Sequence, residues 1–117
     1  MQPPERAKRV IFVDEPTRDV FVRLKRGTFE EKRLFGYLES ARRELQANPF
    51  SGRKVKRELW PQTYTRKYCI NNLWKYNLSD GWRLIYTIRG DAVEIVAVVL
   101  EWMSHKEYAK RFGYKLD

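Results

Sequence analysis

The sequence predicts a single α+β domain, in which helices pack against one largely antiparallel sheet. The chain has 117 residues, which is the usual size of one domain. A short strand-like segment is followed by two amphipathic helical segments, then by three strand-like segments separated by turns, and finally by a short helix. We therefore expect residues 1–117 to form one domain, with residues 1–8 as a flexible start.

The first predicted elements are a strand and a helix. Residues 9–14 are rich in β-branched and aromatic side chains, which favour a strand. Residues 17–26 carry Val20 and Leu24 four positions apart and are followed by Gly27, a residue that commonly ends helices. This pattern predicts a first helix over residues 17–26.

A second, longer helix is predicted to begin at Thr28. Glu31 lies three residues after Thr28, and this spacing is typical of a capping box, in which each side chain binds the other residue's free amide. The helix is expected to stop at residues 48–49, an Asn-Pro pair. Its buried stripe is expected to consist of Leu34, Leu38, Ala41 and Leu45. The basic stretch that follows, residues 53–57, stays unassigned between strand and coil, and the role of residues 58–72 stays open.

Three strands are predicted in the second half of the chain. Residues 73–78 and 82–88 flank an Asp-Gly turn at 79–81, which predicts a hairpin. A second turn at 89–91 leads to residues 92–100, an almost continuous apolar run that is typical of a strand covered on both faces. The three segments are expected to form an antiparallel meander.

The last predicted element is a short helix that carries the only histidine. Ser104 and Glu107 have the spacing of a capping box, and Gly113 is positioned to end the helix. Residues three apart lie near one another on a helix, so three polar side chains are expected to project together. These residues are His105, Tyr108 and Arg111.

The charge of the chain indicates a polyanionic partner. Its 24 Lys and Arg residues against 15 Asp and Glu residues give a formal net charge of +9. Residues 53–111 hold 12 of these basic residues and 6 of the acidic ones, so the second half is the expected anion-binding surface. The alternative is a solvated surface that serves solubility alone.

The cysteine content and the hydropathy pattern indicate a cytoplasmic protein. Cys69 is the only cysteine, so an internal disulfide is excluded. No apolar run approaches the roughly 18 to 20 residues of a membrane helix. The first residues lack the apolar core and cleavage site of a signal peptide. We expect no membrane partner.

Four sequence segments together resemble the RelE/ParE toxin superfamily. They are Asn-Pro-Phe-Ser-Gly at 48–52, Leu-Trp-Lys-Tyr at 73–76, Gly-Trp-Arg-Leu-Ile-Tyr at 81–86 and His-Lys-Glu-Tyr at 105–108. The resemblance covers nearly the whole chain and implies a small RelE-like fold with an N-terminal strand, a two-helix hairpin, a three-stranded meander and a short C-terminal helix. It also implies the toxin of a type II toxin-antitoxin system, neutralised by a cognate antitoxin.

The resemblance also suggests site residues. Arg83 matches the arginine that binds the scissile phosphate in RelE-like toxins, and His105 and Tyr108 match the late His-x-x-Tyr of the HigB-like branch. RelE has two lysines two residues apart before the arginine, whereas this chain has Lys75 at one place and Asn77 at the other. The implied activity is metal-independent endonucleolytic cleavage of messenger RNA on the ribosome.

The residues themselves fit metal-free RNA cleavage. This reaction needs a base, an acid and cations that stabilise the phosphorane, and histidine, which ordinarily titrates near pH 6.5, is the natural proton carrier. One histidine and no tight carboxylate cluster leave too few ligands for a metal, and no cofactor is expected. Beyond the catalytic candidates Arg83, His105 and Tyr108, the expected RNA- or phosphate-binding residues are Lys75, Lys106, Arg111, Arg53, Lys54, Lys56 and Arg57.

Other interpretations of the same residues remain open. His105 is also compatible with an ordinary surface position at a helix start, and Arg83 with a solvent-facing strand residue paired to an acidic neighbour. At the level of function, the alternatives are a non-cleaving module that binds RNA or the ribosome, and a ParE-like inhibitor of gyrase. Fold alone does not decide between them.

Overall fold

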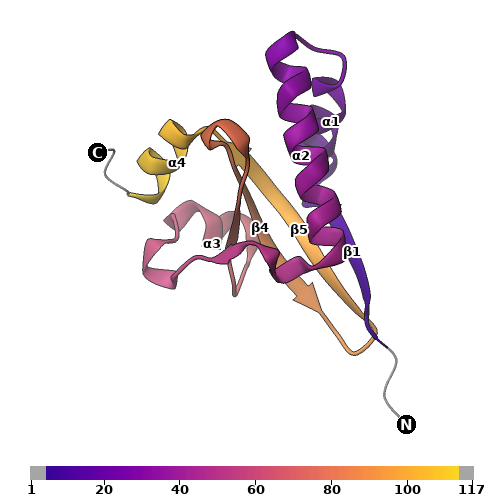
Figure 1. The fold of residues 1–117 in the computed structure, drawn as a ribbon. Helices are drawn as coiled ribbons and strands as arrows, with labels where there is room; N and C mark the ends of the chain where they lie inside the picture. The colour runs from indigo at the N-terminus through magenta and orange to yellow at the C-terminus, as the bar shows by residue number, and fades with distance from the viewer. Residues whose placement is uncertain (1–4, 114–117) are drawn as a thin grey trace.

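A computed structural model describes residues 5–113, and its central element is a five-stranded mixed sheet (Figure 1). In the order β1-β5-β4-β3-β2, β1 runs parallel to β5 and the other neighbours are antiparallel. The α+β class and the antiparallel meander of the last three strands are confirmed. The strands are β1 (Ala7–Phe12), β2 (Arg53–Lys54), β3 (Trp74–Asn77), β4 (Arg83–Gly90) and β5 (Glu94–Met103).

The first strand begins earlier than the sequence predicts. Ala7 and Lys8 pair with Glu94 and Ile95 of β5, so these two residues of the segment predicted to be flexible are held in the sheet. Residues 1–4 of that segment lie outside the described residues. Within residues 5–113, no helix combines the length and the apolar character needed to cross a membrane.

The α-helices that the sequence predicts are present, and their caps explain their bounds. Thr28 Oγ1 accepts a hydrogen bond from Glu31 N (3.2 Å), and Glu31 Oε1 accepts one from Thr28 N (3.0 Å), which confirms the capping box. The first helix starts before residue 17, because the carboxylate of Asp14 accepts the amide of Thr17 at 2.8 Å and caps it. The α-helices are α1 (Glu15–Leu24), α2 (Phe29–Ala47), α3 (Gln62–Tyr68) and α4 (His105–Phe112).

The segment between α2 and β3, most of which the sequence left unassigned, contains short elements. These are β2, α3 and two 3₁₀ turns, η1 (Pro49–Ser51) and η2 (Arg57–Leu59), and a third 3₁₀ turn, η3 (Ser79–Gly81), lies in the hairpin. The seven residues of α3 bury only Tyr64 and Tyr68, and no side chain caps its start. So short a helix leaves little periodic signal in the sequence.

Helices cover both faces of the sheet. Figure 1 shows the hairpin of α1 and α2 on one side and α3 with α4 on the other. Leu38 and Leu45 of α2 pack with Tyr86 in the first layer, and Tyr64 of α3 packs with Ile85 in the second. Residues 95–100 of β5 are all buried, which confirms that this strand is covered on both faces.

Candidate functional site

Four of the predicted site residues come together where β3, β4 and α4 meet. Lys75 on β3 pairs with Ile85 on β4, and Arg83 lies two residues before Ile85, so Lys75 and Arg83 share the face that α3 and α4 cover. Arg83 also pairs with Met103, the last residue of β5, and α4 begins two residues later at His105. Lys75, Arg83, His105 and Tyr108 are called the cationic cluster below.

Arg83 is half-buried, and its guanidinium is held from two sides. Its Nη1 donates hydrogen bonds to the carbonyl oxygens of Gly81 (2.7 Å) and Trp82 (3.3 Å). Its Nη2 lies 3.4 Å from His105 Nδ1. Within residues 5–113 no carboxylate forms an ion pair with Arg83, so the arginine is not the acid-paired surface residue of the alternative interpretation.

Tyr108 lies beneath the two cations rather than beside them at the surface. Its side chain is buried, and Lys75 Nζ and the Arg83 guanidinium carbon lie 5.1 Å and 5.5 Å from the centre of its ring. These distances are typical of cation–π contacts. The ring also stacks on Phe112. His105 is exposed and Lys75 and Arg83 are half-buried, whereas the tyrosine ring beneath them is buried.

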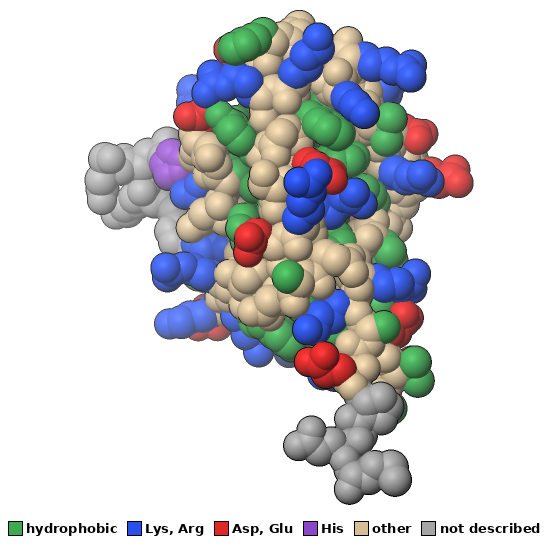
Figure 2. Space-filling view, turned by 45° about the vertical axis from the view of Figure 1, so that its right-hand side comes forward, with side chains coloured by type: hydrophobic (Ala, Val, Ile, Leu, Met, Phe, Trp, Pro, Cys, Tyr) green, Lys and Arg blue, Asp and Glu red, His purple; other side chains and the backbone are tan. Residues whose placement is uncertain are grey.

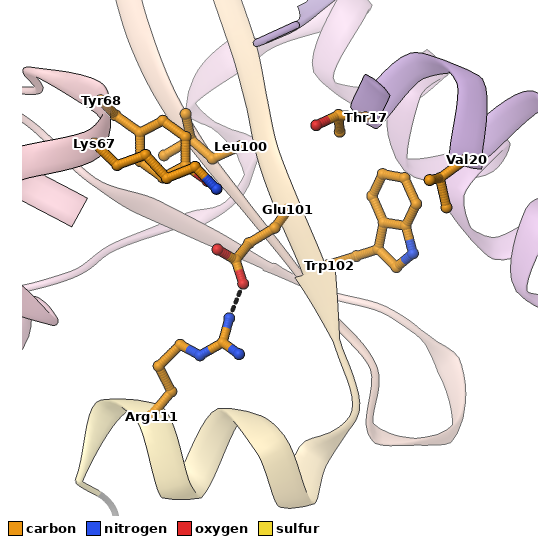
Figure 3. Close-up of a pocket in the computed structure, with 8 residues that line it drawn as sticks. All are labelled: Thr17, Val20, Lys67, Tyr68, Leu100, Glu101, Trp102 and Arg111. Carbon is orange, nitrogen blue, oxygen red and sulfur yellow. Dashed lines mark hydrogen bonds and ion pairs between the residues drawn. The ribbon is translucent and has the colours of Figure 1, made fainter. Parts of the chain in front are cut away.

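The prediction that Arg111 shares a face with His105 is wrong. Arg111 forms an ion pair with Glu101 of β5 and lines an open cavity of about 400 Å³ with Lys67 and Trp102 (Figure 3). At 3.6 residues per turn, a step of three residues turns the helix by about 300°, so two such steps place the side chains roughly 120° apart. His105 and Arg111 therefore point to different neighbours.

The remaining basic candidates lie around the cluster, on β2 or in the segment that follows β2. Arg53 on β2 pairs with Lys75 and is exposed, and Lys106 is exposed on α4. Figure 2 shows lysine and arginine side chains spread over the face in view, with acidic side chains between them. A cavity of about 390 Å³ in the segment after β2 is lined by Lys54, Val55, Lys56, Arg57, Trp60 and Asn71.

Trp60 is the aromatic side chain of this second basic region. The Arg57 guanidinium carbon lies 5.2 Å from the Trp60 ring, and Trp60 Nε1 donates a hydrogen bond to the Val55 carbonyl (2.9 Å). The indole is thereby held beside the Arg57 guanidinium. Such an arrangement suits a phosphate backbone with an adjacent base.

The sequence did not reveal a polar network behind the cluster. Tyr37 of α2 donates its hydroxyl to the Asp80 carboxylate at 2.7 Å, and Arg33 donates to both the Tyr37 hydroxyl and Asp80 at 2.9 Å. The hydrogen bond to Tyr37, followed by the charges of Tyr37 and Asp80, raises the pKa of Arg33. The Asp-Gly turn was visible in the sequence, but its partners on α2 leave no local pattern.

The cluster contains the groups that bind an anion and move a proton. A guanidinium and an ammonium can hold phosphate oxygens, and an imidazole can donate or accept a proton. Across the described part of the chain, no group of three or more His, Cys, Asp or Glu side chains is placed to hold a metal ion. The chemistry that these residues offer is electrostatic stabilisation and acid–base catalysis.

The chain was compared with known protein families, curated proteins and solved structures. Residues 18–100 match the family model described as the ParE toxin of the type II toxin-antitoxin system parDE. The matched span includes Lys75 and Arg83 and ends before His105. No curated protein and no solved structure compared with the chain matches it. The chain therefore belongs to the ParE toxin family, within the RelE/ParE superfamily of type II toxins.

Proposed function

We propose that this toxin cleaves messenger RNA on the ribosome without a metal ion, and that the cationic cluster holds the scissile phosphate. The observation that carries the proposal is the 3.4 Å separation between Arg83 Nη2 and His105 Nδ1. It brings a phosphate-binding group and a proton carrier within the span of one phosphodiester. Lys75 adds a second cation over the same Tyr108 ring.

The proposed reaction is a transesterification. The ribose 2′-oxygen loses its proton and attacks the adjacent phosphorus, and the bond from phosphorus to the 5′-oxygen breaks. The products are a 2′,3′-cyclic phosphate and a 5′-hydroxyl, which takes up a proton. His105 carries one of the two protons and solvent exchanges the other, while Arg83 and Lys75 stabilise the charge on the phosphorane. Tyr108, which is buried, supports the cations and transfers no proton in this reaction.

The partners follow from the same proposal. Membership of a toxin-antitoxin family implies a cognate antitoxin. Because messenger RNA is translated in the cytoplasm, the proposed activity takes place there. The exposed Arg53, next to Lys75, extends the cationic surface from the cluster toward the basic region around Trp60, which would bind the RNA backbone beyond the cleaved bond.

Inhibition of gyrase is the second candidate function. The family model that matches describes ParE toxins, and its match ends at residue 100, before His105. Toxins of the ParE branch act on gyrase, as the sequence resemblance already implied. In addition, Asn77, which pairs with Arg83 in the β3–β4 ladder, occupies the place of the second lysine of RelE.

The test measures both activities with the same purified chain. Cell-free translation reactions receive the wild type, Arg83→Gln, His105→Gln or Arg89→Gln, and primer extension maps the ends of the message. Arg89 is the matched control, because it is an exposed arginine at the other end of β4. A gyrase supercoiling assay runs in parallel.

We expect the wild type and Arg89→Gln to truncate the message and to leave supercoiling unaffected. Arg83→Gln and His105→Gln are expected to slow cleavage by roughly 10²- to 10⁴-fold, the usual contribution of a positioned acid–base or charge-stabilising group. Inhibited supercoiling with intact message would establish the gyrase candidate. Salt-dependent RNA binding with no cleavage would establish the binding module. Full cleavage by both cluster variants would refute the residue assignment.

A further inference from the structure

The β3–β4 turn is fixed to α2 by a network that the proposed reaction does not use. Tyr37 and Arg33 both bind the Asp80 carboxylate, at 2.7 Å and 2.9 Å, across more than forty residues of sequence. The turn does not need these bonds to close. Backbone hydrogen bonds from Leu78 N to Trp82 O and from Trp82 N to Ser79 O already close it, so the network sets the orientation of the turn relative to α2.

The same turn contacts the cationic cluster through Gly81, the residue that follows Asp80. Asp80 and Gly81 both have positive φ, 57° and 78°. This conformation leaves the Gly81 carbonyl within 2.7 Å of Arg83 Nη1, while Arg83 Nη2 lies 3.4 Å from His105. A rotation of the peptide after Gly81 would move the acceptor that holds the guanidinium. The contacts therefore run without a gap from Tyr37 to His105.

We infer that Tyr37 and Arg33 are positioning residues: by holding Asp80, they fix the Gly81 carbonyl that keeps the Arg83 guanidinium beside His105. The expected effect on RNA cleavage rests on the proposed function. The expected effect on the environment of His105 does not. A guanidinium only donates, so a hydrogen bond across this 3.4 Å separation requires His105 Nδ1 as the acceptor and the proton of the neutral ring on Nε2. The state of the imidazole therefore reports the network.

The experiment uses the full chain and its single histidine, which gives one set of imidazole signals in ¹⁵N-resolved NMR spectra. Tyr37→Phe removes only the hydroxyl, and Asp80→Asn keeps a residue that tolerates positive φ while removing its charge. Tyr76→Phe is the control for loss of a hydroxyl in the same layer, and Glu94→Gln, which breaks the pair with Arg9, is the control for loss of an exposed ion pair. Thermal unfolding checks that each variant is folded.

We expect the wild-type ring to show the Nε2–H tautomer, and the two network variants to shift toward a mixture of tautomers. Both control variants are expected to keep the wild-type signals. Single-turnover cleavage is expected to fall roughly 10- to 100-fold in Tyr37→Phe, as small misplacements of catalytic groups do, while the Kd for RNA changes less than about twofold.

The outcomes separate the two proposals. Unchanged imidazole signals in folded Tyr37→Phe and Asp80→Asn would overturn the positioning role, whatever the activity. Equal shifts in Tyr76→Phe would overturn it as well, because they would show a general effect of the layer. If the wild type does not cleave RNA but the imidazole responds as expected, the proposed function fails and the positioning of Arg83 beside His105 stands.

Discussion

Gly81 is the residue at which the β3–β4 turn touches the candidate site. Its φ of +78° lies in the left-handed region, and a Cβ at this position would lie 3.0 Å from the Cβ of His105. We expect Gly81→Ala to lower the free energy of unfolding by about 1–2 kcal/mol, the cost of a left-handed conformation for a residue with a Cβ. It should also displace His105. Denaturant unfolding and the imidazole NMR signals measure the two effects.

Gly36 provides the matched control for this substitution. It lies within α2, and a Cβ there would meet nothing within 4 Å. Gly36→Ala is expected to raise stability by roughly 0.5–1 kcal/mol, because alanine loses less conformational entropy in a helix. A Gly81→Ala variant as stable as the wild type, with unchanged histidine signals, would contradict the contact between the turn and His105.

At the residue scale, the sequence pointed to some members of the candidate site and not to others. Lys75, Arg83 and His105 are recognisable because each stands in a local motif on a strand or at a helix start. The side-chain direction of Tyr108 is decided by packing of α4 on the sheet, which no local pattern records. Asp80 was recognised as a turn residue, but its partners on α2 are distant in sequence.

At the scale of single elements, the cap of α2 offers a direct test of helix stability. Thr28 Oγ1 is the acceptor for Glu31 N, so Thr28→Ala removes half of the capping box. The expected cost is about 1 kcal/mol in the free energy of unfolding, measured with urea. Thr63→Ala is the control, because Thr63 is exposed and no side chain caps the start of α3, the helix to which it belongs. It should change stability by less than about 0.5 kcal/mol. Equal losses in the two variants would contradict the assigned role of Thr28.

Elements with strong local signals were predictable, and elements that depend on their neighbours were not. α2 has a cap, a stripe and a stop in its own sequence, and β5 has a long apolar run. β2 has only two residues and exists because Arg53 and Lys54 pair with β3. The parallel pairing of β1 with β5 joins segments far apart in the chain, and the sequence of neither strand specifies its partner.

At the scale of the whole molecule, buried tyrosines predict loss of stability at alkaline pH. Burial raises the pKa of Tyr86 from its usual 10.0 to about 12, and burial also raises the pKa of Tyr64. A neutral phenol with a raised folded-state pKa contributes stability that is fully present below about pH 10. This contribution is lost as the pH rises toward 12, because the unfolded chain ionises first.

The measurement is the urea midpoint between about pH 8 and pH 11, and the contribution of these tyrosines to the free energy of unfolding should stay constant up to about pH 10 and fall above it. Tyr86→Phe removes one of the titrating groups and should flatten this decrease. It should also lower stability near neutral pH by about 1–3 kcal/mol, because the buried Tyr86 hydroxyl donates to Pro49 O (2.8 Å) and accepts from Gly52 N (3.1 Å). The same pH dependence in this variant and in the wild type would show that Tyr86 does not contribute.

The position of the last strand in the sheet has a consequence for biosynthesis. β5 lies between β1 and β4, so the first strand made has no neighbour until the fifth strand has left the ribosomal exit tunnel. Such long-range pairing is slow and comes late in folding. His105 follows β5 in the chain, and the cationic cluster is complete only after it emerges. A nascent chain therefore lacks its complete cluster while its own ribosome is still translating the sequence up to His105.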